Sequence, residues 1–292
     1  MKARLALAVL TLVTPLACDP GPSSTASWPG VQPQTAGATP AAASPACGKA
    51  ATKGVLAKKV TVFGKSRSYT LVVPASYAPE ISQPLVYVLH GHGGSGAQAR
   101  ASFDLEGASA GKALFLYPDG LGGGWDLDSE TGKNRDVAFF DAMLAQVQSE
   151  YCVDLHRVFL AGFSNGAYMA NQIACRRAER VRAVVTHSGG GPYDNTAGAK
   201  YDDHGHLECA KPVGSLVIHG AADGTVAPGE GQKSIDHWTA ANHCGAAAAP
   251  SGPCATYAGC TNPVIACKVH GLGHSVWGEA PKRAWAFFDS QR

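Results

Sequence analysis

The sequence has little charge, and no part of it carries a long run of one sign. Only 16% of its 292 residues are Asp, Glu, Lys or Arg, and the formal net charge is +2. Proteins that bind nucleic acid usually present a basic patch to the phosphates. Because the sequence has no such patch, nucleic acid is not an expected partner.

Long apolar runs are missing after residue 17, so no transmembrane helix is expected. Near the start, two basic residues precede an apolar run over 5–17, which predicts a secretory signal peptide over residues 1–17. Cys18 follows Leu16-Ala17 as in a bacterial lipobox, although Pro15 stands where leucine is usual. Two outcomes stay open: an exported lipoprotein on the cell surface, with Cys18 as its membrane anchor, or cleavage and free secretion.

Large apolar residues are scarce over 18–46, where Pro, Ser, Thr and Ala dominate. Such a segment cannot bury a core and is expected to be a disordered tether. Residues 47–292 are enough for a single catalytic domain. No internal repeat divides them.

Pairs with C-x-x-C spacing, the usual signature of zinc, do not occur among the nine cysteines. Apart from Cys18, the cysteines form an even set, which predicts up to four disulfides in an exported protein. Eight cysteines allow 105 pairings, so the sequence leaves the connectivity open. A Cys175–Cys209 bridge is one hypothesis; the other members of the set are Cys47, Cys152, Cys244, Cys254, Cys260 and Cys267.

Short apolar runs alternate with amphipathic segments along the domain. This alternation predicts an α/β fold with a doubly wound, mostly parallel sheet. An antiparallel pair over 58–64 and 68–74 is expected to open it. Further strands are expected at 84–90, 113–118, 157–162, 182–189, 214–220 and 264–270, and helices at 98–110, 137–148, 167–177, 231–241 and 281–290.

The segment Gly162-Phe163-Ser164-Asn165-Gly166 joins one of these strands to a helix. A serine at such a turn is the nucleophile elbow of the α/β-hydrolases, in which an acid and then a histidine follow on later strands. Asp223, after the strand at 214–220, and His274, after the strand at 264–270, satisfy that order. The predicted fold is therefore an α/β-hydrolase with a Ser164–His274–Asp223 triad.

Other residues compete for these roles. Asp202 and Asp203 precede their strand. Asp119 lies before Ser164 in YPDG, a sequence typical of turns. His270 stands at a strand end, whereas His219 precedes the Asp223 loop and is expected to brace it.

Backbone N–H groups must stabilise the oxyanion of such a reaction. We expect one from Asn165, which follows the nucleophile, and one from His92 in the glycine-rich turn HGHGGSG. A metal site built from His90 and His92 is the competing interpretation, but no third ligand lies nearby in the sequence. We therefore expect no metal and no cofactor.

Taken together, these motifs resemble the secreted polyhydroxybutyrate depolymerase and feruloyl esterase group of α/β-hydrolases (carbohydrate esterase family 1). The resemblance covers roughly residues 47–289 and rests on HGHGGSG, YPDGLGGGWD, DVAFFDAML, YCVDLHRVFLAGFSNGAYMAN, HGAADGTV and GLGHSVWG. It implies the same triad, the same oxyanion donors and hydrolysis of carboxylic esters. The acid loop departs from the family because no proline follows the aspartate, and His92 stands where cysteine is common.

Two loops are candidates for binding the substrate. Trp125, in the loop over 120–135, either stacks on an aromatic acyl group or sugar, or caps the edge of the core. Tyr193 lies in the loop over 189–208, and Trp277 follows the histidine of the triad. The loop over 189–208 also carries four polar residues that either bind a cation or are simply solvated: Asp202, Asp203, His204 and His206.

The sequence thus predicts an exported serine esterase. Its first expected substrates are feruloyl or acetyl esters on plant cell-wall polysaccharide, with a polyhydroxybutyrate or other polyester as the alternative. A serine peptidase on the same fold and a non-catalytic binding protein are the remaining hypotheses.

Overall fold

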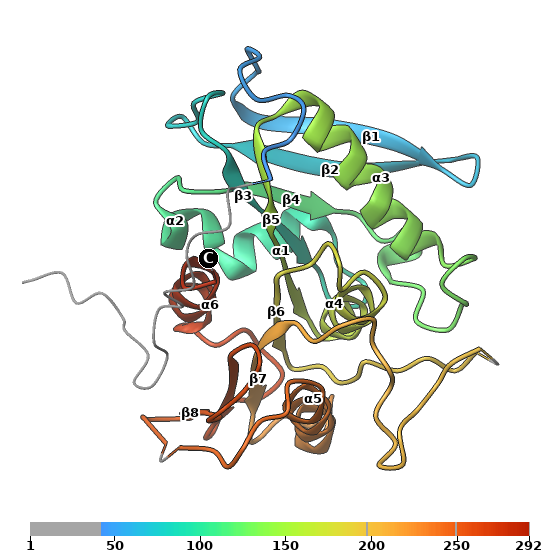
Figure 1. The fold of residues 1–292 in the computed structure, drawn as a ribbon, viewed down its shortest axis with the longest axis vertical. Helices are drawn as coiled ribbons and strands as arrows, with labels where there is room; N and C mark the ends of the chain where they lie inside the picture. The colour runs from blue at the N-terminus through green and yellow to red at the C-terminus, as the bar shows by residue number, and fades with distance from the viewer. Residues whose placement is uncertain (1–41, 197, 249, 292) are drawn as a thin grey trace, which may run out of the picture.

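A single nine-stranded sheet forms the centre of the protein (Figure 1). The computed structural model describes residues 42–196, 198–248 and 250–291. The strands lie in the order β1-β2-β4-β3-β5-β6-β7-β9-β8, and the pairs from β4 to β9 are parallel. The strands are β1 (Gly54–Val62), β2 (Lys65–Val73), β3 (Gln83–Leu89), β4 (Leu114–Pro118), β5 (Val153–Phe163), β6 (Ala183–His187), β7 (Gly214–Gly220), β8 (Cys254–Thr256) and β9 (Val264–Val269).

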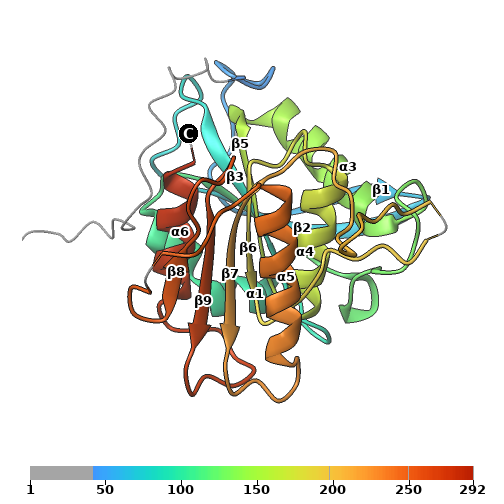
Figure 2. The ribbon, with the colours of Figure 1, turned by 60° about the horizontal axis from the view of Figure 1, so that its bottom comes forward.

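Helices cover both faces of this sheet (Figures 1 and 2). One face packs against α3 (Arg135–Glu150), α4 (Asn165–Arg176) and α5 (Pro228–Ala241). The other packs against α1 (Gly96–Phe103), α2 (Leu105–Ser109) and α6 (Ala280–Asp289). Successive side chains of a strand point to opposite faces, so Leu85 and Tyr87 of β3 enter the first core and Val86 and Val88 enter the second. The predicted doubly wound α/β-hydrolase fold is confirmed.

Some element boundaries differ from the sequence-based expectation. The helix expected over 98–110 is two helices, because Asp104 adopts a left-handed conformation (φ 41°) between α1 and α2. Strand β8 was not expected; it pairs antiparallel with β9 at the edge of the sheet. Ordered structure begins before residue 47, since Ala43 bridges Asp154 and Ser44 Oγ donates a hydrogen bond to the carbonyl of Tyr151.

Four disulfides join the eight cysteines of the domain. They are Cys47–Cys152, Cys175–Cys209, Cys244–Cys260 and Cys254–Cys267. The second confirms the pairing hypothesised from the sequence and ties the end of α4 to the segment before β7. Each native bridge typically contributes about 2–4 kcal/mol to stability.

A buried ion pair joins β2 to α3. Arg67 Nη2 lies 2.6 Å from Asp136 Oδ1, and both side chains are almost completely shielded from solvent. The same guanidinium donates to the carbonyl of Asp119, and Asp136 Oδ2 accepts the N–H of Asp126. The pair therefore fixes both ends of the loop over 119–126, which faces the turn after β3.

The predicted signal peptide (residues 1–17), Cys18 and most of the predicted tether lie outside the described residues. Within the described ranges, no helix is both long and apolar enough to cross a membrane.

Candidate active site

Ser164 lies on a sharp turn between β5 and α4. Its backbone is strained, with φ 53° and ψ −123°. The flanking glycines permit the turn: a Cβ at Gly162 would collide with the carbonyl of Gly166, and one at Gly166 with the carbonyls of Leu89 and His90. This is the geometry of a nucleophile elbow, and it raises the serine side chain above the carboxyl edge of the sheet.

The structure brings the three predicted triad side chains together. His274 Nε2 lies 3.0 Å from Ser164 Oγ, and His274 Nδ1 lies 2.9 Å from Asp223 Oδ2. Because Nδ1 faces a carboxylate, it donates its proton there, which leaves Nε2 free to accept the serine proton. Each side chain follows the end of a strand, β5, β7 or β9, so the parallel sheet itself assembles the group.

Asp223 is held as a carboxylate although it is buried. Its Oδ1 accepts the N–H groups of Thr225 and Val226 at 3.0 and 2.9 Å. Burial acts to raise the pKa of Asp223, but hydrogen bonds from His274, Val226 and Thr225 outweigh it and leave this pKa below its ordinary value. The carboxylate is therefore charged at neutral pH and can stabilise an imidazolium on His274.

The competing histidine candidates occupy other places. His219 donates through Nε2 to the carbonyl of Val226 at 3.0 Å and lies 3.5 Å from Asp223 Oδ2. It therefore braces the Asp223 loop, as expected. His270 is exposed at the end of β9.

The competing carboxylates stabilise turns. Asp119 accepts hydrogen bonds from Ser68 Oγ and from the N–H of Gly96. Exposed Asp202 accepts the N–H groups of His204 and His206 within its own loop. Asp203 is exposed in the same loop.

The two expected oxyanion donors belong to neighbouring segments, since a Cβ at Gly124 would contact the side chains of both His92 and Asn165. Asn165 is the first residue of α4, and His92 lies in the turn after β3. That turn is fixed by a 2.7 Å hydrogen bond from the N–H of Gly93 to the carbonyl of Gly123. Among the described residues neither the N–H of His92 nor that of Asn165 has an acceptor, so both can donate to a ligand.

His90 is a structural residue of this turn. Its Nε2 accepts the N–H of Gly120 at 2.9 Å, and Nδ1 donates to the carbonyl of Gly91 at 2.7 Å. Both ring nitrogens are thus occupied, and burial lowers the pKa of His90, which keeps the ring neutral. Nothing in this arrangement supports a metal at His90 and His92.

The interpretation that Trp125 stacks on the substrate is wrong, because this side chain is buried in the core edge. Only 7% of it is exposed, and its indole N–H donates to the carbonyl of His90 at 2.8 Å. The ring packs on that of His90, with centroids 4.7 Å apart. Trp125 therefore caps the core edge, which was the other possibility left open, and its backbone N–H holds the side chain of Asn165.

His187 is a residue of the site that the sequence did not reveal. It ends β6, and its Nε2 accepts the N–H of Trp277 at 2.9 Å, while Nδ1 lies 3.0 Å from Ser188 Oγ. This contact anchors the loop that carries His274. Burial, reinforced by the nearby His219 and His274, lowers the pKa of His187 to about 3, so the ring is neutral and can accept. Its place at the end of a central strand was the only available signal.

His187 predicts a loss of stability in acid. Unfolding returns its pKa to about 6.5, so between pH 6.5 and 3 the unfolded chain binds more protons than the folded protein. The free energy of unfolding should therefore fall as the pH drops through this window. His187→Gln, which keeps an acceptor but cannot be protonated, is expected to flatten the slope, measured by urea unfolding at pH 4.5 and 7. An unchanged slope would contradict this account.

The described residues of the 189–208 loop contain no group of three or more side chains placed to hold a metal ion. Within the described ranges, one such group occurs outside this loop: Cys175, Cys209 and His237. The two cysteines are joined in a disulfide and cannot act as thiolate ligands.

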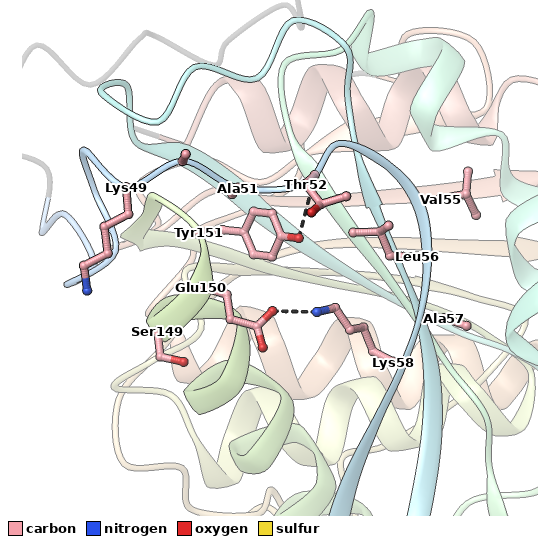
Figure 3. A pocket seen from close by; sticks show the side chains of 11 residues that line it. Lys49, Ala51, Thr52, Val55, Leu56, Ala57, Lys58, Ser149, Glu150 and Tyr151 are labelled. Atoms are coloured by element: carbon pink, nitrogen blue, oxygen red, sulfur yellow. Dashed lines mark hydrogen bonds and ion pairs between the residues drawn. The ribbon is translucent and has the colours of Figure 1, made fainter.

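A large surface hollow, whose lining residues Figure 3 shows, contains none of the triad residues. It has a volume of about 570 Å³ and is bounded by residues 49–52, by β1 and by the end of α3. Lys58 and Glu150 pair across it at 2.7 Å, and Tyr151 donates to the carbonyl of Thr52. Its lining includes Ser149 but no histidine.

Comparison with known proteins gives consistent results, although no protein-family model matches the chain. The chain is 32% identical over 264 residues to a probable feruloyl esterase C of Aspergillus niger, covering 84% of this chain and 90% of that protein. It is also 32% identical over 266 residues to feruloyl esterase C of Emericella nidulans, with the same coverage. Among solved structures, the acetyl xylan esterase of Aspergillus awamori superposes with a TM-score of 0.61 at 19% identity, covering 80% of this chain and 99% of that one.

Proposed function

This chain belongs to the feruloyl esterase family, and on that premise we propose that it hydrolyses hydroxycinnamoyl or acetyl esters of plant cell-wall polysaccharide through a Ser164–His274–Asp223 triad. The protein is a carboxylic ester hydrolase with the α/β-hydrolase fold. The observation that carries the proposed mechanism is the pair of hydrogen bonds, 3.0 and 2.9 Å, that joins the three side chains in the order required for acyl transfer.

In the first half of the reaction, Ser164 Oγ attacks the ester carbonyl while His274 Nε2 takes its proton. Asp223 keeps the imidazole in the correct tautomer and stabilises its positive charge. The N–H groups of His92 and Asn165 donate to the carbonyl oxygen as it becomes negative. The alcohol then leaves with the proton from His274, and the acyl group stays on Ser164.

In the second half, water replaces the alcohol. His274 removes a proton from the water, which attacks the carbonyl carbon of the acyl-enzyme. The same two N–H groups again hold the carbonyl oxygen. Ser164 leaves with the proton that His274 returns, and the free acid is released. The chain's own residues supply every proton transfer.

The substrate class is tested by comparing kcat/KM on methyl ferulate, p-nitrophenyl acetate and a short 3-hydroxybutyrate oligomer, with Ser164→Ala as the blank. We expect methyl ferulate and the acetate to be hydrolysed and the oligomer to be a poor substrate. A clear preference for the oligomer would instead make the protein a polyester depolymerase. A matched amide of ferulic acid tests the peptidase hypothesis, and we expect it to be cleaved far more slowly than the ester.

We also propose that the protein is exported, with residues 1–17 as its signal peptide. The four disulfides support this, because such bonds persist in oxidising compartments. Lipid on Cys18 remains the finer proposal. The intact mass of the exported protein decides between the lipidated form and a form without lipid.

A further inference from the structure

A cluster of phenol and carboxylate groups links α4, the helix that follows Ser164, to α5. Glu230 Oε2 accepts the hydroxyl of Tyr193 at 2.6 Å and that of Tyr168 at 3.1 Å. Glu230 Oε1 accepts from Lys233 Nζ at 2.7 Å on the solvent side. The two tyrosine rings pack obliquely, with centroids 6.1 Å apart. None of these four residues takes part in the proton transfers of the triad.

The backbone places this cluster close to the nucleophile. Tyr168 lies one helical turn after Ser164 on α4, and its N–H donates to the Ser164 carbonyl at 3.2 Å. One turn of helix is about 5.4 Å long. Glu230 is in the first turn of α5, which follows the Asp223 loop directly. The cluster therefore lies between α4, which begins directly after the nucleophile, and α5, which follows the loop that carries the acid.

The segment that bears Tyr193 is held in place. Asn171 Nδ2 donates to the carbonyl of Gly190 at 2.9 Å, and Ser234 Oγ donates to that of Gly191 at 2.8 Å. A Cβ at Gly190 would come within 2.6 Å of Glu230 Oε2 and 2.7 Å of the Tyr168 ring. The tyrosines and the carboxylate are thus preorganised by tight packing, which lowers the entropic cost of binding a ligand there.

The cluster has the charge state needed to accept another phenol. Burial acts to raise the pKa of Glu230, but hydrogen bonds from Lys233, Tyr193 and Tyr168 hold it below its ordinary value. Burial, together with this carboxylate, raises the pKa of both tyrosines, so they remain donors. A carboxylate has about four lone-pair positions. Three of the four on Glu230 are used here. The one used by Lys233 is held only weakly, because the Lys233 side chain is 62% exposed.

We propose that Tyr168, Tyr193 and Glu230 form the surface that recognises a phenolic acyl group, with the rings packing on its aromatic ring and Glu230 accepting its hydroxyl. This inference rests on the proposed function and names the acyl preference of the same site. A phenol is chemically the donor that Glu230 already binds twice. An acetyl group has neither ring nor hydroxyl and would leave the surface unused.

The test compares methyl p-coumarate with methyl cinnamate, which differ only in the phenolic hydroxyl, and includes p-nitrophenyl acetate. A hydrogen bond to a charged group changes affinity by roughly tenfold or more. Glu230→Gln should therefore lower the p-coumarate-to-cinnamate ratio of kcat/KM by about tenfold. Tyr193→Leu should lower kcat/KM for both aromatic esters relative to the acetate by about fivefold, since an aromatic pair contributes at that level.

One matched variant serves as the control. Tyr201→Leu removes a half-exposed tyrosine of the loop that bears Tyr193. Its hydroxyl bonds to the Asp194 backbone, and its loss should leave the aromatic preference unchanged.

The possible failures are distinguishable. If the unmodified protein hydrolyses both aromatic esters and Glu230→Gln keeps the wild-type ratio, the recognition surface is wrong while the proposed function stands. If Tyr193→Leu lowers kcat/KM for p-nitrophenyl acetate as much as for the two aromatic esters, the cluster does not recognise the acyl ring and the inference is also overturned. If the unmodified protein hydrolyses the acetate but neither aromatic ester, the proposed hydroxycinnamoyl activity fails together with the inference.

Discussion

Ser164→Ala is expected to lower kcat on a carboxylic ester by about 10⁶-fold, the loss seen when the nucleophile of a serine triad is removed. The substitution deletes only Oγ, so the alanine meets the same strained backbone (φ 53°) with the same Cβ. The free energy of unfolding should therefore change by less than about 1 kcal/mol. A loss of kcat without a loss of stability would show that Ser164 acts in the reaction and not in maintaining the fold. Urea unfolding and steady-state kinetics on p-nitrophenyl acetate measure the two quantities.

The acid can be tested on the same substrate. Asp223→Asn should lower kcat by about 10⁴-fold, because an amide at this position favours the wrong tautomer of His274. Ser275→Ala serves as the control, since Ser275 is the exposed neighbour of His274 and should retain wild-type rates. Near wild-type activity of Asp223→Asn would mean that another carboxylate orients the histidine.

The strands and the candidate triad could be predicted because their signals are local or ordered along the chain. Continuous apolar runs such as 84–90 and 214–220 mark strands buried on both faces, and β3 and β7 confirm them. The order serine, acid, histidine then selects among many residues of the same type. Parallel strands place all their carboxyl ends at one edge, so residues 51 and 110 positions apart along the chain still meet.

Other features could not be predicted, because they depend on contacts that only the folded chain makes. Nothing near His187 indicates that its ring accepts the N–H of Trp277, 90 residues later. From the sequence, Trp125 can be assigned to the substrate or to the core with equal reason. Only the folded chain brings its indole N–H to the carbonyl of His90. Asp104 interrupts an apparently helical segment through a left-handed conformation that most side chains avoid.

Asp136→Ala is expected to lower the free energy of unfolding by about 3–5 kcal/mol, the usual cost of leaving a buried charge without its partner. The guanidinium of Arg67 would stay 1% exposed with its carboxylate gone. For a domain of this size, each kcal/mol shifts Tm by about 2–4 °C, so a decrease of roughly 10 °C should be seen. Asp141→Ala, on the same helix, breaks the partly exposed pair with Arg177 and should cost about 1 kcal/mol or less.

The same substitution should also reduce activity, because Asp136 supports one side of the proposed oxyanion site. Its Oδ2 accepts the N–H of Asp126, at the end of the loop whose Gly123 carbonyl holds the turn after β3. A looser turn would misplace the N–H of His92, and one misplaced oxyanion donor costs up to 10²–10³ in kcat. We therefore expect kcat to fall while KM changes little, measured at a temperature where the variant is fully folded. Asp136→Ala could instead prove no less stable than Asp141→Ala. The backbone carbonyls of Asp119 and Arg135 would then be enough to compensate the charge of Arg67. In that case the ion pair would not be what holds this loop.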